Sequence, residues 1–69
     1  MKHVFGEQLT ALRIEANLSR AQLAEKLNVS VRLISSWENG QRECDFDMLI
    51  KIADLFSVSI DFLLGRKDY

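Results

Sequence analysis

The sequence predicts an all-α fold, a compact bundle of five short helices, and three observations predict it. Apolar residues recur at spacings of three and four along the whole chain, whereas strand-like alternation is weak. A Ser or Asp that can cap a helix precedes an apolar run at four positions. The chain contains no proline, and its 69 residues are enough for one domain, which we expect to span residues 1–69.

The first two helices follow from apolar spacing and from a capping signal. We expect the first over about residues 3–16, on the spacing of Phe5, Leu9, Leu12 and Ala16. The second is expected over residues 20–27, because Ser19 fits an N-cap and Gln22, three residues later, completes a capping box. Asn28 tolerates the left-handed conformation that ends helices, so the second helix is predicted to stop there.

The third helix is predicted over residues 31–38 by a similar signal. Ser30 can cap it, and the dipeptide Asn39-Gly40 stops it. About three residues then separate the second helix from the third. This is the length of the turn in a helix-turn-helix motif.

Two further helices complete the predicted bundle. Asp45 can cap a fourth helix over residues 46–56, and Ser59 can cap a fifth over residues 60–64, which Gly65 ends. Each cap contributes about 1 kcal/mol, which is a large share of the stability of so small a domain.

The third predicted helix has one apolar side and one polar side on a helical wheel. Ile34 and Trp37 lie on the apolar side, where Glu38 is an anomaly. The other side carries hydroxyl, amide and guanidinium groups, from Arg32, Ser35, Ser36 and Asn39. A helix of this width fits the major groove of DNA, and Arg can donate two hydrogen bonds to guanine. The alternative interpretation is an ordinary solvated face.

Arg20 and the distribution of charge favour the interpretation as a DNA-binding face. Arg20 falls in the first turn of the second predicted helix, where the helix dipole favours an anion such as phosphate. Residues 20–42 contain four basic and two acidic residues, whereas residues 43–69 contain three basic and six acidic ones. Although the net charge is only −1, residues 20–42 are mildly basic and residues 43–69 are acidic. Such a charge asymmetry can orient a protein on DNA.

Two runs of the chain carry a family resemblance: LSRAQLAEKLNVSVRLISSWENGQR and LIKIADLFSVSIDFLLGR. They resemble the phage repressor and Cro family of helix-turn-helix proteins, often called Xre-type, over roughly residues 5–66. The resemblance implies a lambda-repressor-like DNA-binding domain of five helices. It further implies a sequence-specific transcriptional regulator, of repressor type, that binds a near-palindromic operator in double-stranded DNA as a homodimer.

Carried over by position, the resemblance implies two groups of DNA contacts and one structural pair. The residues that face bases are Val31, Arg32 and Ser36. The residues that contact phosphate or the DNA backbone are Arg20, Ser30, Asn39 and Arg42. Family members have a partly buried ion pair where this chain has Arg13 and Glu38. Such a pair would account for Glu38 on an apolar side, because a buried charge needs a partner.

The chain departs from the family pattern at four positions. Family members often have Gln at Arg20, a polar residue at Val31, a long polar residue at Ser36 and a proline near Cys44. Valine cannot hydrogen-bond a base and can only pack on a thymine methyl, so direct readout is expected to depend mainly on Arg32.

Other function classes find little support in the sequence. No Ser/His/Asp set, metal-ligand spacing or phosphate-binding loop is present, so we expect no enzyme, no metal site and no cofactor. Cys44 is the single cysteine, which excludes an internal disulfide and fits a reducing, cytoplasmic compartment. Glu43 and Asp45 beside it oppose the low thiol pKa of a redox sensor. The N-terminal MKHVFGEQLT has no long apolar run, so neither a signal peptide nor a membrane span is expected.

Two expectations concern protein partners. Ile60 and Phe62 are expected to be exposed on the fifth helix and to form a homodimer contact, unless Phe62 folds back on the first or fourth helix. The competing function is a protein-interaction module, such as an antirepressor or antitoxin, that docks a partner helix through its acidic C-terminal part and the apolar Val31 and Leu33. An additional sensing domain is a further possibility that the resemblance leaves open.

Overall fold

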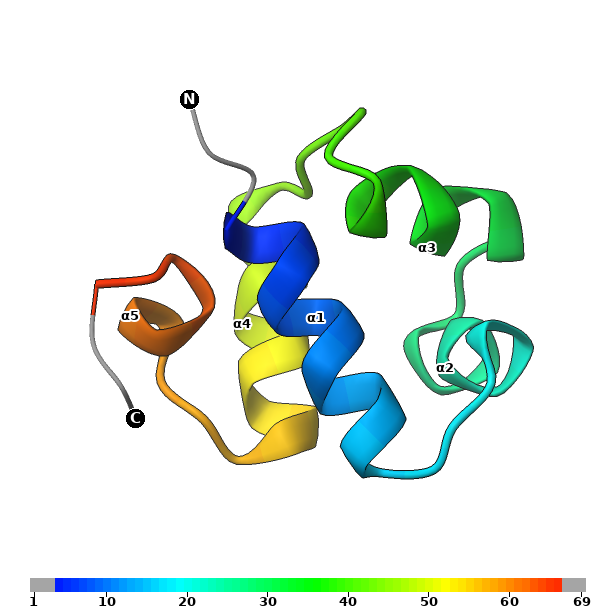
Figure 1. Cartoon of the computed structure of the whole chain (residues 1–69), viewed down its shortest axis with the longest axis horizontal. Coiled ribbons are helices and arrows are strands. Elements are labelled where there is room, and N and C mark those ends of the chain that lie inside the picture. Colours follow the sequence, from blue (N-terminus) through cyan, green and yellow to red (C-terminus); the bar gives the residue numbers. More distant parts are fainter. Residues whose placement is uncertain (1–3, 67–69) are drawn as a thin grey trace.

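The computed structural model describes residues 4–66, which contain five α-helices and no strand (Figure 1). Their bounds are α1 Val4–Glu15, α2 Arg20–Leu27, α3 Val31–Glu38, α4 Phe46–Phe56 and α5 Ile60–Leu63. The predicted all-α fold is confirmed, and α2, α3 and α4 have the predicted bounds. The expected first residue of the first helix, His3, lies outside the described residues. The fifth helix ends one residue earlier than predicted, because Leu64 is its C-cap.

Each of the four helices after α1 begins directly after the cap residue that the sequence predicts. Backbone N–H groups three residues into each helix donate to the side-chain oxygens of Ser19, Ser30, Asp45 and Ser59, over 2.8–3.1 Å. At α2 the side chain of Gln22 also accepts from the backbone N–H of Ser19, at 2.8 Å, so the predicted capping box is complete. These caps fix where each helix starts.

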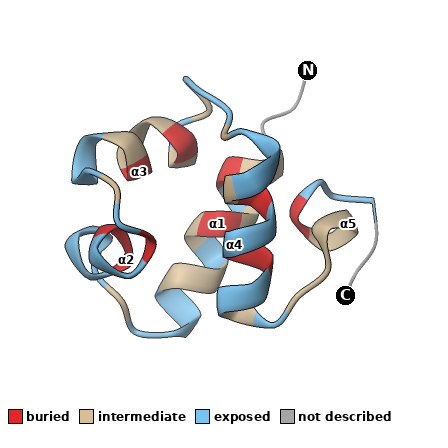
Figure 2. Ribbon diagram, turned by 180° about the vertical axis from the view of Figure 1, so that it is seen from behind, coloured by how far each residue is buried: buried red, intermediate tan, exposed pale blue. Residues whose placement is uncertain are grey.

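The core lies where the helices face one another, and the exposed faces turn outward (Figure 2). Its largest fully buried side chains come from all five helices: Leu9, Leu23, Leu27, Ile34, Ile52 and Leu63. Helix α1 contacts both α3 and α5, so it joins the α2–α3 pair to the α4–α5 pair. Lys51 of α4 donates to the carbonyl of Leu27 at 2.9 Å, at the C-terminal end of α2 where the helix dipole favours a cation.

The prediction that Ile60 is exposed was wrong, and for Phe62 the structure favours the alternative, in which the side chain folds back on the rest of the protein. Both side chains are half-buried and pack against the core. The Nε2 of Gln8 in α1 donates to the carbonyl of Phe62 at 3.1 Å, which ties the four-residue α5 to α1. Because α5 has a single turn, most of its apolar side chains lie against the rest of the protein. Part of each of these side chains stays accessible to solvent.

None of the helices in residues 4–66 is both long enough and apolar enough to cross a membrane.

Candidate nucleic-acid interface

Helices α2 and α3 form a two-helix unit whose inner sides are buried. The turn between them consists of residues 28–30, and Asn28 adopts the left-handed conformation, with φ 60°. The side chains of Leu23 and Leu27 from α2 and of Ile34 and Trp37 from α3 are all buried in the core. Away from this buried side, the first turn of α3 is exposed (Figure 2), and Ser35 and Ser36 are half-buried.

The outward side of α3 carries the residues predicted to face bases. Arg32 is exposed and forms no ion pair with any of residues 4–66. Val31 at the start of the helix is 44% exposed. Ser36 is half-buried, and its carbonyl accepts from the backbone N–H of Gln41 at 2.9 Å. Arg32 is therefore the long polar side chain that this face offers.

The four residues predicted to contact phosphate lie at the ends of α3, in the loop after it and at the start of α2. Ser30 caps α3, because its Oγ accepts from the N–H of Leu33 at 3.1 Å, and its hydroxyl proton remains available as a donor. Asn39 is exposed at the end of α3, and Arg42 is exposed in the loop that follows. Arg20 lies at the start of α2.

The structure places Arg13 and Glu38 in an ion pair between α1 and the end of α3. The Nε of Arg13 lies 2.7 Å from Oε2 of Glu38, and its Nη1 donates to the carbonyl of Leu18 at 2.9 Å. The side chains of Arg13 and Glu38 are only 12% and 2% exposed. The pair explains how a carboxylate is accommodated on the apolar side of α3.

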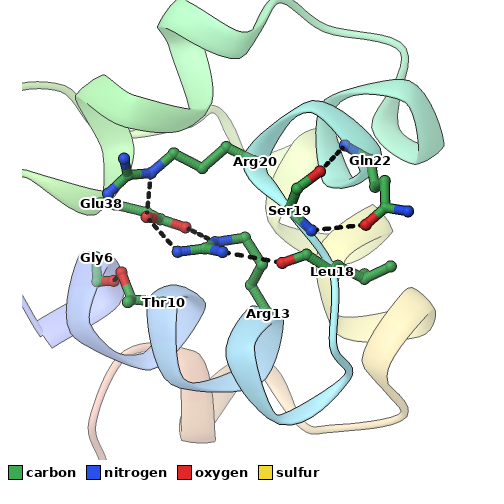
Figure 3. A network of polar contacts seen from close by, with 8 residues as sticks. All are labelled: Gly6, Thr10, Arg13, Leu18, Ser19, Arg20, Gln22 and Glu38. Carbon is green, nitrogen blue, oxygen red and sulfur yellow. Dashed lines mark hydrogen bonds and ion pairs between the residues drawn. The ribbon is translucent and has the colours of Figure 1, made fainter.

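Glu38 has a second cationic partner that the sequence did not reveal. The Nε of Arg20 donates to Oε1 of Glu38 at 2.9 Å, so two guanidinium groups flank one carboxylate (Figure 3). Arg20 and Glu38 are 18 residues apart, and no local spacing signals a contact over that distance. The side chain of Arg20 is nevertheless 48% exposed, so its predicted availability to phosphate is reduced rather than lost.

The two arginines keep Glu38 ionised. Burial by itself would raise the pKa of Glu38, but the hydrogen bonds and charges of Arg13 and Arg20 outweigh that effect and hold its pKa below the ordinary value. The three residues together therefore carry a net charge of one positive unit, and the exposed part of that charge belongs to Arg20.

Cys44 has the environment of an unreactive thiol. Burial raises the pKa of the Cys44 thiol to about 11, and the negative charges of Asp45 and Glu43 act in the same direction. A protonated thiol is a poor nucleophile and a poor metal ligand. No group of His, Cys, Asp and Glu within residues 4–66 is arranged to hold a metal ion.

Comparisons with known proteins identify the family. Residues 9–63 match the model of a family described as "Helix-turn-helix". The transcriptional regulator ImmR of Bacillus subtilis is 36% identical over 91% of this chain and 50% of its own length. The transcriptional activator BcrR of Enterococcus faecalis is 44% identical over 93% of this chain and 31% of its own length. The cryptic phage CTXphi transcriptional repressor RstR of Vibrio cholerae is 35% identical over 87% and 54%, respectively.

The chain thus spans between about a third and a little over half of the length of these relatives. A search of solved structures gave no significant match. The matched region contains α2, the turn and α3 in full, together with the caps that define them. On this evidence the chain belongs to the helix-turn-helix family, of the phage repressor and Cro, or Xre, type.

Proposed function

We propose that this chain is a transcriptional regulator that binds a near-palindromic operator in double-stranded DNA as a homodimer. The observation that carries the proposal is the orientation of α3, which buries Ile34 and Trp37 and leaves Arg32 exposed on the opposite side. In a helix-turn-helix domain the second helix of the motif enters the major groove in this manner. We propose no enzymatic activity and no cofactor for this chain.

The proposed contacts divide into base readout and phosphate binding. Arg32 binds a guanine through two hydrogen bonds, Val31 packs on a thymine methyl, and Ser36 adds a hydroxyl at the edge of the face. The phosphate contacts come from the residues around this face, Arg20, Ser30, Asn39 and Arg42. Phosphate contacts fix the position of the protein on DNA, whereas the base contacts supply specificity.

Repression is the proposed mode of action, because the chain resembles the phage repressor and Cro family, and a bound repressor excludes other proteins from promoter DNA. One relative is described as a transcriptional repressor and another as a transcriptional activator. A reporter gene placed behind the selected operator distinguishes the two outcomes, since repression lowers its expression and activation raises it.

Selection of bound sites from a random pool of duplex DNA tests the proposal. We expect two half-sites with centres separated by about 10–10.5 base pairs or a multiple of that spacing. The variant Arg32→Ala should lose about 1–3 kcal/mol at one base position of each half-site and bind random duplex almost as the wild type does. Lys26→Ala is the matched control, because it removes one positive charge from the exposed surface of α2 outside the proposed contacts.

The outcomes separate DNA binding from the competing function. An Arg32→Ala variant that loses equal affinity for selected and random DNA would contradict the proposed base readout. A protein-interaction module stays a second candidate because Val31 is 44% exposed and Leu33 is half-buried, at the two edges of the outward face of α3. Binding to DNA weakens steeply as salt rises, whereas docking of an apolar partner on this face should change little.

A further inference from the structure

The guanidinium of Arg20 has two edges, and only the edge with Nε is bonded to Glu38 (Figure 3). The Nε edge is engaged, because Nε donates to Oε1 of Glu38 at 2.9 Å. A guanidinium carries five N–H donors, and four of them are on the two Nη atoms. No residue among 4–66 accepts a hydrogen bond from the Nη atoms of Arg20, and half of the side chain is exposed.

Glu38 is itself held rigidly enough to orient a partner. Arg13 donates to both carboxylate oxygens, from Nε to Oε2 at 2.7 Å and from Nη2 to Oε1 at 3.3 Å. The carboxylate is almost fully buried and sits at the last residue of α3. A side chain that is bonded twice and buried offers Arg20 an acceptor at one fixed place.

The bond between Arg20 and Glu38 also joins the two helices of the motif at their open end. Arg20 is the first residue of α2, Glu38 is the last residue of α3, and residues 28–30 connect the two helices at the other end. The position of Arg20 is therefore tied to the position of α3, the helix proposed to read bases.

We propose that Glu38 is a positioning residue for DNA binding: it holds Arg20 by Nε so that the Nη edge binds a backbone phosphate while α3 lies in the groove. This inference rests on the proposed DNA-binding function. It assigns a role to a buried carboxylate that does not touch DNA. In this arrangement Arg20 binds Glu38 and a phosphate at the same time. A lysine ammonium has one nitrogen and cannot bind both in the same geometry.

For the removal of the Glu38 charge, a positioning role and a purely electrostatic role predict opposite changes in DNA affinity. Removing an acidic charge near DNA normally strengthens binding, because it lowers repulsion of the phosphates. If Glu38 orients Arg20, then Glu38→Gln should weaken binding even though the protein becomes more positive. Glu25→Gln is the matched control, since it removes the same charge from the exposed surface of α2, and it should bind equally or slightly more tightly.

The test measures the dissociation constant for random-sequence duplex by fluorescence anisotropy at one salt concentration, at a temperature where circular dichroism shows each variant folded. We expect Glu38→Gln and Arg20→Lys each to weaken binding about three- to tenfold, the range of one hydrogen bond's net contribution. In the double variant the two losses should not add, because both remove the same oriented contact.

Three results would overturn the inference. Glu38→Gln binding as tightly as Glu25→Gln would show that Glu38 only repels DNA. Arg20→Lys binding like the wild type would show that charge suffices at this position, and this arm decides the question if Glu38→Gln does not fold. Losses that add in the double variant would show independent roles. Wild-type protein that does not bind duplex would instead contradict the proposed function, which the first measurement of the series reveals.

Discussion

At Gly6 the absence of a side chain decides how closely α1 approaches α3. Gly6 is buried, and a Cβ there would overlap the carbonyl oxygen of Trp37 and lie 2.8 Å from that of Glu38. Both obstacles are backbone atoms, so neither can rotate away. The close approach also matters two turns later in α1, where Arg13 reaches Glu38. One small residue therefore supports the ion pair at the end of α3.

Gly6→Ala should destabilise the protein although alanine is the better helix former. Alanine gains about 1 kcal/mol of helix propensity over glycine, whereas forcing atoms into a packed site costs about 1–3 kcal/mol. The expected net result is a lower midpoint of urea unfolding. Glu7→Ala, one residue along on the exposed side of α1, is the control and should change the midpoint little. A Gly6→Ala variant as stable as the wild type would show that the steric cost of the added Cβ is no larger than the gain of about 1 kcal/mol in helix propensity.

At the scale of the element, α3 depends on its cap and on the core rather than on its own propensity. Its eight residues are too few to form a stable helix in isolation. Two buried side chains, Ile34 and Trp37, hold it against the rest of the protein, and Ser30 fixes its first turn. A helix with so few internal hydrogen bonds is sensitive to the loss of any one of these supports.

Ser30→Ala should lower the free energy of unfolding by about 1 kcal/mol, because the N–H of Leu33 loses its acceptor. Equilibrium urea unfolding followed by tryptophan fluorescence measures this, since Trp37 lies on the same helix. Ser35→Ala removes the same hydroxyl from the interior of α3, where alanine is the better helix former, and should not be destabilising to that extent. Equal losses in the two variants would mean that the cap contributes nothing specific.

Helix boundaries could be predicted from the sequence because their signals are local. A cap and the N–H that it accepts are three residues apart, so Ser19, Ser30 and Asp45 could be identified without knowing the fold. The contact between Arg20 and Glu38 could not, because it depends on how α2 and α3 cross. The burial of Ile60 was also missed, since a four-residue helix is too short for a wheel to show which side faces inward.

At the scale of the whole molecule, the five helices include two pairs, α2–α3 and α4–α5, with different roles in the proposal. The α2–α3 pair carries the proposed DNA contacts, and α4 and α5 form the other pair (Figure 1). The basic excess of residues 20–42 and the acidic excess of residues 43–69 follow the same division. The acidic excess makes the side of the molecule that holds α4 and α5 the less favourable one to lie against DNA.

The homodimer contact is proposed to lie on α5, where Ile60 and Phe62 each keep part of their surface accessible. A dimer is needed for a near-palindromic operator, because one protomer reads one half-site.

Gel filtration with multi-angle light scattering should show a concentration-dependent dimer, and Ile60→Asp should shift it to monomer, since burying an unpaired carboxylate is costly. Ile14→Asp is the control on α1, where Ile14 is 59% exposed and lies outside the proposed contact. Ile60 also packs against the core, so urea unfolding must show that the variant is folded before its mass is interpreted. A folded Ile60→Asp variant with unchanged mass, or a wild-type protein that stays monomeric at every concentration and on operator DNA, would exclude α5 as the dimer contact.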